Sequence, residues 1–391
     1  MKICGIIAEY NPFHLGHIKQ IKYAKKELGA EKVVIILSGN FTERGEPAVL
    51  NKFLRAEHAI KGGADLVIEL PTVLTVANAE TFAFGAVSLL NSLGVADGLC
   101  FGVESGEKEQ YISLAREMNN ESKEFKKILK ENLEKGYSLC KSKYETVKAL
   151  GGEYDESLIS SPNNILGLEY TKALLKLNSA IEIFPLKREV NHAEEKLRKG
   201  ISSAGSIRKA IRAGKKRATK VALPKFVYKD LKGFPEELEK TTLAAAIIKD
   251  AEEIAEVPDC TEGLENRIKA LLKDNKTLPE LLNKVTTRRY TESRIRRILT
   301  CNLLGITRPL VVTALNKPLY AKVLATNKSG LELIAEIEKN GNVPLLTRKS
   351  DLSKLGKSAL AVYDIDVIAN ELYSLSTGEK INENQMIIAE R

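Results

Sequence analysis

The chain of 391 residues has five cysteines, and none of them is spaced for metal binding. Cys4, Cys100, Cys140, Cys260 and Cys301 are scattered along the chain without a C-x-x-C pair. This pattern favours reduced thiols in a cytoplasmic protein and argues against a zinc site. Cys4 and Cys100 lie in apolar segments, where we expect them to be small core residues.

The sequence also lacks a long uninterrupted apolar run. Its most apolar stretch, residues 82–103, is broken by Gly94, Asp97 and Gly98. The pattern favours a helix, a turn and a buried strand over a membrane span. The chain opens directly into a strand without the features of a signal peptide, so we expect a cytoplasmic protein with no membrane partner.

Acidic residues are in the minority: 51 Asp and Glu stand against 60 Lys and Arg, for a net charge of +9. The excess favours a polyanionic partner, but net charge mainly reports solubility and non-specific attraction. With 43% hydrophobic and 28% charged residues, the composition is that of an ordinary globular protein. The length predicts two or three domains.

Histidine is scarce as well, and two of the four histidines, His14 and His17, are three positions apart. An apolar run at 3–8 and a chain-breaking Asn-Pro-Phe at 11–13 precede them, and helical periodicity follows. This order predicts a strand, a tight loop and a helix whose first turn carries both imidazoles. Because a helix N-terminus has unpaired N–H groups and a partial positive charge, we expect residues 7–20 to bind a nucleotide's phosphates, including charge that develops during nucleotidyl transfer. The alternative is that the histidines are cap or surface residues.

Apolar strands alternate with helices through the first half of the chain. We expect strands at 2–9, 32–37, 65–70, 98–103 and 180–186, and helices at 15–28, 51–61, 79–93 and 162–176. Because β-loop-α-β units give parallel sheets, this half is predicted to be a parallel α/β sheet. Residues 107–150 interrupt it with two or three polar helices, which we interpret as a solvated helical insertion.

Several residues follow the strands, at the edge where α/β sheets place their sites. Arg44, in the loop 38–47, is a candidate for binding phosphate or a carboxylate, or else a solvated charge. Gly102 ends the fourth strand, where the missing side chain would admit an adenine or ribose, or would only form a turn. Lys187 and Arg188 follow the fifth strand and are expected to point into the same crevice.

A second anion-binding helix start is predicted at 200–209, where hydroxyls and glycines precede a helix with Arg208 on its first turn. The alternative is an ordinary serine cap. Residues 196–220 hold ten basic residues and no acidic one. They are expected to contact a nucleic-acid backbone, or else to form a solvated basic face.

A boundary at 222–224 (Ala-Leu-Pro) divides the chain into residues 1–222 and a mainly helical C-terminal domain, residues 223–391. This second part is predicted to have helices at 235–256, 261–273, 278–284 and 290–303, followed by strands at 320–326 and 343–346 and helices at 329–339 and 361–373 that form a small α/β appendage. A basic cluster is expected to contact phosphates, with Tyr290 stacking on a base; its members are Lys284, Arg288, Arg289, Arg294, Arg296 and Arg297. The predicted fold is α/β: a Rossmann-like parallel sheet, with a mainly helical C-terminal domain bearing the appendage.

Two motifs of the first half resemble the nucleotidyltransferase superfamily. His14-Leu15-Gly16-His17 is similar to its His-x-Gly-His signature, and residues 201–208, ISSAGSIR, are similar to an Ile-Ser-Ser-Thr-x-x-Arg element. Ala204 stands where Thr is common, so a hydroxyl contact must come from Ser203 or Ser206, or be absent. Three longer motifs, at 9–17, 39–47 and 161–167, resemble the bacterial tRNA(Met) cytidine acetate ligase family.

The resemblance implies a two-step reaction. Acetate attacks the α-phosphate of ATP to give acetyl-adenylate and pyrophosphate, and the amine of the wobble cytidine of elongator tRNA(Met) then takes the acetyl group. It implies catalytic roles for His14, His17 and Arg208, and ATP contacts from Gly102, Asn163, Arg188, Ser203 and the whole first loop: Ile7, Ala8, Glu9, Tyr10, Asn11, Pro12, Phe13, His14, Leu15, Gly16, His17, Ile18, Lys19 and Gln20. Mg²⁺ is expected to offset the triphosphate charge, although no carboxylate cluster requires it.

Two other functions stay open from the sequence. One is a small-molecule adenylyltransferase, which would not need the basic C-terminal half. The other is an RNA-binding protein with a non-catalytic nucleotide site.

Overall fold

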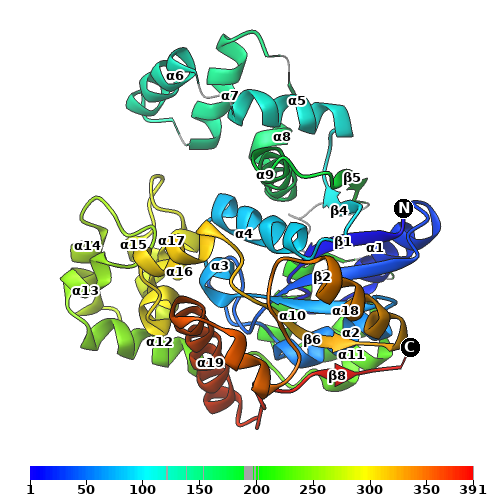
Figure 1. Cartoon of the computed structure of the whole chain (residues 1–391). Helices are drawn as coiled ribbons and strands as arrows, with labels where there is room; N and C mark the ends of the chain where they lie inside the picture. Colours follow the sequence, from blue (N-terminus) through cyan, green and yellow to red (C-terminus); the bar gives the residue numbers. More distant parts are fainter. Residues whose placement is uncertain are drawn as a thin grey trace.

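The protein is built around one sheet of eight strands, as seen in a computed structural model that describes residues 1–119, 122–137, 139–152, 154–188, 197, 200 and 202–390 (Figure 1). The strands are β1 (Ile3–Ala8), β2 (Lys32–Ser38), β3 (Leu66–Leu70), β4 (Gly98–Val103), β5 (Glu182–Lys187), β6 (Ala321–Thr326), β7 (Leu345–Leu346) and β8 (Ile387–Ile388). Their order is β5-β4-β1-β2-β3-β6-β7, with β8 also paired to β6. Strands β1 to β5 run parallel, so the predicted parallel sheet is confirmed.

Helices cover both faces of the sheet, which explains why its strands are almost uniformly apolar. On one face Cys4 and Ile6 of β1 belong to a core with α1 (Leu15–Lys26), α2 (Lys52–Lys61), α10 (Ala204–Arg212) and α11 (Lys225–Asp230). On the other face Ile3 and Ile7 of the same strand belong to a core with α4 (Ala79–Ser92), α9 (Pro162–Lys176) and α18 (Lys328–Asn340). Cys4 and Cys100 are fully buried, as expected, while the side chain of Cys140 lies outside the described residues.

Two groups of helices lie beyond these layers. The polar helices expected at 107–150 are α5 (Lys108–Asn119), α6 (Lys123–Glu134) and α7 (Leu139–Ala149), which stand away from the sheet past α8 (Ser157–Ser160) and α9 (Figure 1). A second lobe contains α12 (Glu237–Ile248), α13 (Ala251–Ala255), α14 (Leu264–Leu272), α15 (Leu278–Val285), α16 (Glu292–Leu304) and α17 (Arg308–Asn316). The remaining elements are α3 (Thr72–Thr75), η1 (Lys216–Val221), η2 (Lys349–Lys354) and α19 (Lys357–Thr377).

The helix predicted at 235–256 is in fact two helices, α12 and α13. The break falls at Lys249 and Asp250, where Lys249 is extended and Asp250 caps α13 by accepting a hydrogen bond from the Glu253 N–H. Among the described residues, no helix has by itself the length and apolar composition to cross a membrane; α16 and α17 meet that test only as a pair, bent by 92°.

The C-terminal strands are not an appendage of the helical part. Strand β6 pairs antiparallel with β3, with Glu69 opposite Lys322, and β7 and β8 pair with β6. The predicted strands are therefore present, but their predicted placement is wrong. Without β6, strand β3 would leave a row of unpaired N–H and C=O groups at the edge of the sheet. This pairing crosses the division at residue 222, which stays a prediction.

Candidate functional site

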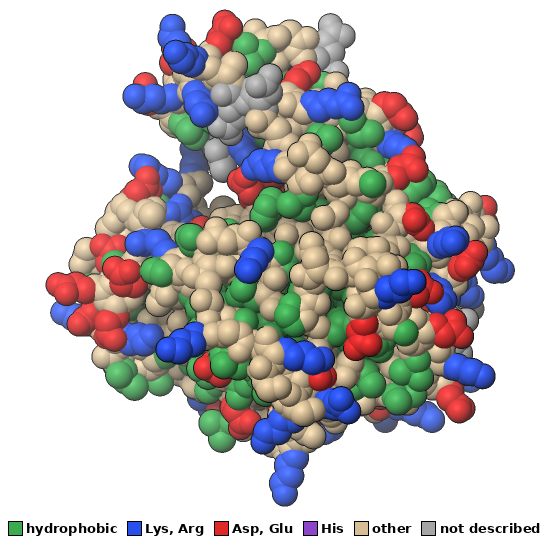
Figure 2. Space-filling view, in the orientation of Figure 1, with side chains coloured by type: hydrophobic (Ala, Val, Ile, Leu, Met, Phe, Trp, Pro, Cys, Tyr) green, Lys and Arg blue, Asp and Glu red, His purple; other side chains and the backbone are tan. Residues whose placement is uncertain are grey.

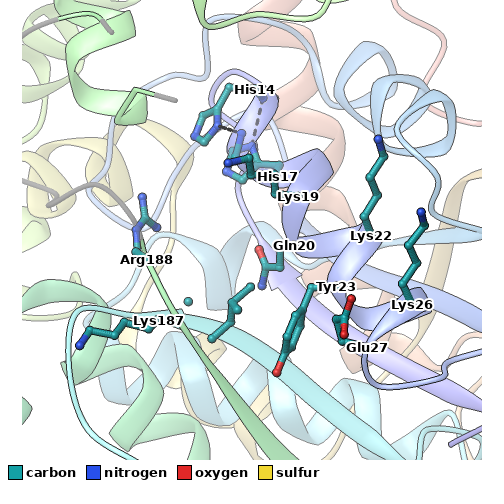
Figure 3. Close-up of a pocket in the computed structure, with 13 residues that line it drawn as sticks. His14, His17, Lys19, Gln20, Lys22, Tyr23, Lys26, Glu27, Lys187 and Arg188 are labelled. Atoms are coloured by element: carbon teal, nitrogen blue, oxygen red, sulfur yellow. Dashed lines mark hydrogen bonds between the residues drawn. The ribbon is translucent and has the colours of Figure 1, made fainter. Parts of the chain in front are cut away.

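His14 caps helix α1 and His17 completes a capping box. The His14 Nδ1 accepts a hydrogen bond from the Gly16 N–H at 3.0 Å, and the His17 Nδ1 accepts one from the His14 N–H at 3.1 Å (Figure 3). Two backbone N–H groups at the start of the helix, which have no partner within the helix, are thereby hydrogen-bonded to imidazoles. Because each Nδ1 is an acceptor, each neutral ring carries its proton on Nε2. Both rings therefore keep an N–H donor for a ligand.

Packing fixes the orientation of the two rings. They stack with centroids 3.6 Å apart, and Tyr10 lies against His17 at 4.6 Å. Gly16 makes this stacking possible, because a Cβ at that position would lie 2.8 Å from Cε1 of His14. The Nε2 of His14 is buried and has no partner among the described residues. The site thus presents a preorganised donor rather than a flexible one.

Both histidines are held in the neutral form. Burial lowers the pKa of His14 to about 3, and the positive charges of Arg188 and Arg208 act in the same direction. Burial, with His14 and Arg188 adding to it, also lowers the pKa of His17 well below its ordinary value. Near neutral pH the rings therefore act on a bound anion as hydrogen-bond donors and not as cations.

The low pKa of His14 should appear in the pH dependence of stability. Between pH 6.5 and 3 the unfolded state binds a proton that folded His14 does not, so the free energy of unfolding should fall with decreasing pH by about 1.4 kcal/mol per unit from this residue. His14→Asn keeps a capping acceptor but cannot titrate. Urea unfolding at pH 7, 6 and 5 should therefore show a flatter loss of stability in the variant, by about 1 kcal/mol per unit. Parallel losses in the two proteins would contradict the low pKa.

A cavity of about 360 Å³ opens beside the histidines, between α1 and the ends of β4 and β5 (Figure 3). Its lining comprises His14, Gly16, His17, Lys19, Gln20, Lys22, Tyr23, Lys26, Glu27, Gly102, Leu186, Lys187 and Arg188. The histidines lie at one end and Tyr23, Lys26 and Glu27 at the other, with Arg188 on the facing wall. The volume is in the range of small-molecule and cofactor sites.

Comparison with known proteins settles the family. The sequence profile of the HIGH Nucleotidyl Transferase family matches residues 1–386. The tRNA(Met) cytidine acetate ligase of Clostridium perfringens strain ATCC 13124 is 36% identical over 401 residues, covering 99% of this chain and 98% of the relative. The tRNA(Met) cytidine acetate ligase of Acetivibrio thermocellus is 35% identical over 415 residues, covering 99% of this chain and 100% of the relative. The chain belongs to the tRNA(Met) cytidine acetate ligase family.

Solved structures of the family have the same fold. The crystal structure of Thermotoga maritima TmcAL in its apo form matches with a TM-score of 0.93 and 30% identity over the whole of both chains. The same protein bound with α-thio ATP matches with a TM-score of 0.91 and 29% identity, again over both whole chains. The fold predicted for the chain, a Rossmann-like sheet with a mainly helical second part, is thereby confirmed.

Some of the ATP contacts expected for this family line the cavity and others do not. Of the predicted residues, His14, Gly16, His17, Lys19, Gln20, Gly102 and Arg188 line it. The sequence did not single out Lys22, Tyr23, Lys26, Glu27 and Leu186. Periodicity could have found Tyr23 and Lys26, because residues 16, 19, 23 and 26 lie on one face of a helix.

The other predicted loop residues do not line the cavity: Ile7, Ala8, Glu9, Tyr10, Asn11, Pro12, Phe13, Leu15 and Ile18. Several of them brace the loop instead. The Glu9 carboxylate accepts from the Glu43 N–H at 2.6 Å, and Asn11 Oδ1 accepts from the Val49 N–H at 2.8 Å. ATP contacts from this group stay predictions.

The facing wall is held by a chain of polar contacts. Arg188 donates through Nη1 to Asn163 Oδ1 at 3.5 Å, and Asn163 Nδ2 donates to Glu104 Oε1 at 2.5 Å. Burial lowers the pKa of Arg188, and Glu104 opposes that shift. Gly102 leaves room for this arginine, because a Cβ there would lie 3.2 Å from Arg188 Cγ. Asn163 thus orients Arg188, and Glu104, which the sequence did not single out, supports both.

Ser203 and Arg208 do not line the cavity. Arg208 lies near residues 9–14, the segment before α1 that we call the histidine loop. Ser203 caps α10 by accepting from the Ser206 N–H at 3.1 Å, as the ordinary-cap alternative predicted, and its hydroxyl also donates to Ser206 Oγ. Arg208 donates through Nη1 to the Asn11 carbonyl at 3.0 Å. A phosphate contact from either residue stays a prediction, and Ile201 of the same motif lies outside the described residues.

Two arginines of the predicted basic cluster at 284–297 face inward. Arg296 and Arg297 are only 9% and 8% exposed. Arg296 pairs with Glu292 at 2.9 Å, and Arg297 pairs with Asp259 at 3.3 Å and with Glu43 at 3.5 Å. The prediction that these two contact RNA phosphates is therefore wrong. Arg297 attaches the loop at 39–47 to α16 through Glu43, and helical spacing alone cannot show that a charged face meets carboxylates of another segment.

Proposed function

We propose that this protein activates acetate with ATP and transfers the acetyl group to the wobble cytidine of elongator tRNA(Met). The observation that carries the proposal is the pair of neutral histidines at the end of a nucleotide-sized cavity. In each ring Nδ1 accepts a hydrogen bond, so the N–H donor is at Nε2. Membership of the family and the α-thio ATP-bound structure of its T. maritima member support it. Such a substrate would place the enzyme in the cytoplasm.

In the first step an oxygen of acetate attacks the α-phosphorus of ATP. The new bond joins acetate to phosphorus, the bond to the bridging oxygen of the β-phosphate breaks, and pyrophosphate leaves. His14 and His17 donate from Nε2 to phosphate oxygens whose negative charge grows in the transition state. Arg188, on the facing wall, holds the pyrophosphate as it leaves. Arg208 acts from behind the loop, close enough for its charge to lower the pKa of His14.

In the second step the N4 amine of cytidine attacks the acetyl carbonyl carbon. An amide bond forms, the bond between the acetyl carbon and the AMP oxygen breaks, and the amine releases a proton to water. No nucleophilic side chain is needed, so the protein contributes positioning and electrostatic stabilisation. This role is consistent with a cavity lined by the hydrogen-bond donors His14, His17 and Arg188.

Magnesium would be held mainly by the phosphates of ATP. Among the described residues no group of three or more His, Cys, Asp and Glu side chains could hold a metal ion, and Glu27 is the acidic residue of the cavity lining. Mg²⁺ commonly binds through substrate phosphates and one or two carboxylates. When bound, it would supply charge neutralisation.

The test is to incubate the protein with ATP, radiolabelled acetate and an unmodified tRNA(Met) transcript. Label should enter acid-insoluble RNA only when ATP is present, and a transcript with uridine at the wobble position should stay unlabelled. Pyrophosphate release on adding acetate, without RNA, reports the first step separately. Absence of labelled RNA while ATP still binds would contradict the proposal, and turnover of another small molecule without RNA would favour an adenylyltransferase.

A further inference from the structure

We propose that the RNA backbone is held by a basic surface on η1 and α11, and not by the arginines of α16. The surface consists of Lys215, Arg217, Lys220, Lys225 and Lys229, and we call it the 215–229 surface. The inference rests on the proposed function and adds the place where the RNA partner binds.

The 215–229 surface carries positive charge that the fold does not neutralise. All five side chains are exposed, and none of them has an ion pair with another described residue within 4.0 Å. No acidic residue occurs between Lys209 and Lys229, and the next one, Asp230, is bonded to His58 at 2.7 Å. A concentrated field of one sign attracts a polyanion and raises its rate of association.

Two neighbouring basic residues, Arg212 and Lys216, contact other parts of the protein and are therefore not counted in the surface. Arg212 pairs with Glu239 at 3.2 Å and lies over the ring of Phe234, and Lys216 donates to the carbonyl of Leu231. These two side chains hold the segment in place. The five residues of the 215–229 surface have no such ion pair with a described residue.

The 215–229 surface is attached directly to the histidine loop and the start of α1. The Leu15 N–H, at the start of α1, donates to the Ala222 carbonyl at 3.1 Å. The ring of Phe226 stacks on that of Phe13, with centroids 6.5 Å apart. Lys220 and Lys225 are therefore close in sequence to the residues that touch the histidine loop. An RNA loop with its phosphates on this surface would have a base within reach of the site.

The other basic segments are less suitable. In α16, Arg296 and Arg297 are turned into ion pairs, as described above, and Arg294 donates to the Asp259 carbonyl at 2.8 Å. The lysines of α6 alternate with Glu124, Glu131 and Glu134, and this helix stands far from α1 (Figure 1). Figure 2 shows that acidic and basic side chains are intermixed across the face that carries α6 and α19. Such a mixed surface gives a weak net field at the distance of an RNA backbone.

The experiment compares two triple variants that remove the same charge. One is Lys215→Ala/Arg217→Ala/Lys220→Ala, and the matched control is Lys123→Ala/Lys127→Ala/Lys130→Ala on α6, whose lysines are also exposed. Affinity for the unmodified tRNA(Met) transcript is measured from about 50 to 200 mM salt. Pyrophosphate release with ATP and acetate, without RNA, checks that each variant is folded and active in the first step.

The first variant should bind tRNA about tenfold or more weakly, with a salt slope shallower by about 2, as expected from three phosphate contacts at roughly 0.7 each. The α6 variant should bind within about twofold of the parent, and both should release pyrophosphate at the parental rate. Equal weakening in the two variants, or parental binding by the first, would overturn the inference while leaving the proposed function intact. If the parent neither binds nor labels tRNA, the proposed function fails together with the surface.

Discussion

Replacing His14 or His17 with alanine should lower the rate of acetyl-adenylate formation by ~10²-fold or more, as loss of one transition-state donor typically does. The reason is geometric. Each ring is locked by a hydrogen bond to Nδ1 at 3.0 or 3.1 Å, so its Nε2–H is aimed before the substrate arrives. Pyrophosphate release on adding acetate, in the absence of RNA, measures this step directly.

The control for this experiment is the third described histidine. His58 is buried outside the cavity and bonds Asp230 at 2.7 Å. His58→Gln should change the rate by no more than about threefold, because it loses no contact to a reacting phosphate. A rate within a factor of two of the parent in both His14→Ala and His17→Ala would remove the histidines from the mechanism.

The two histidine effects should not add. His17 accepts from the His14 N–H, and the rings stack at 3.6 Å, so losing one ring disturbs the other. Residues that act as a unit give a double variant only slightly slower than either single one. Fully multiplicative losses would indicate that the rings act independently.

Lys52→Met should lower the free energy of unfolding by about 3 to 5 kcal/mol, the usual cost of breaking a buried ion pair by removing one partner. The Lys52 Nζ lies 2.7 Å from both Glu69 Oε1 and Glu383 Oε1, and all three side chains are buried. Methionine keeps most of the side-chain volume but leaves the carboxylates of Glu69 and Glu383 with Lys322 as their ion-pair partner among the described residues. Denaturant unfolding at neutral pH measures the loss.

An exposed pair provides the comparison. Lys240 lies 2.9 Å from Glu237, and both side chains are largely exposed to solvent. Lys240→Ala should cost less than about 1 kcal/mol, because solvent screens such a pair. If Lys52→Met were no more destabilising than Lys240→Ala, the buried network would not be holding the molecule together.

This network also explains how distant parts of the chain are joined. Lys52 begins α2 and Glu69 lies in β3, whereas Lys322 lies in β6 and Glu383 comes just before β8. The four charges therefore sit where the C-terminal strands join the N-terminal sheet. Separating them would leave buried charges uncompensated, which favours the observed pairing over alternatives.

Local patterns in the sequence determined much of the site and of the sheet. The stretch from Ile3 to Lys26 forms a strand, a loop and a capped helix. Its two histidines lie at the start of that helix, as the spacing predicts. The motifs also indicated the family, because they preserve the residue types that the chemistry uses. Such features depend on neighbours three or four positions away, which the sequence displays directly.

Only the tertiary structure decided which distant groups meet. It paired β6 with β3, turned Arg296 and Arg297 inward, and joined Arg188 to Glu104 through Asn163. Strand spacing and helical periodicity are the same whichever partner an element finds, so they do not encode these contacts. The choice depends on burying charge with its counter-charge and closing a free sheet edge, and both conditions arise only when the whole chain is packed.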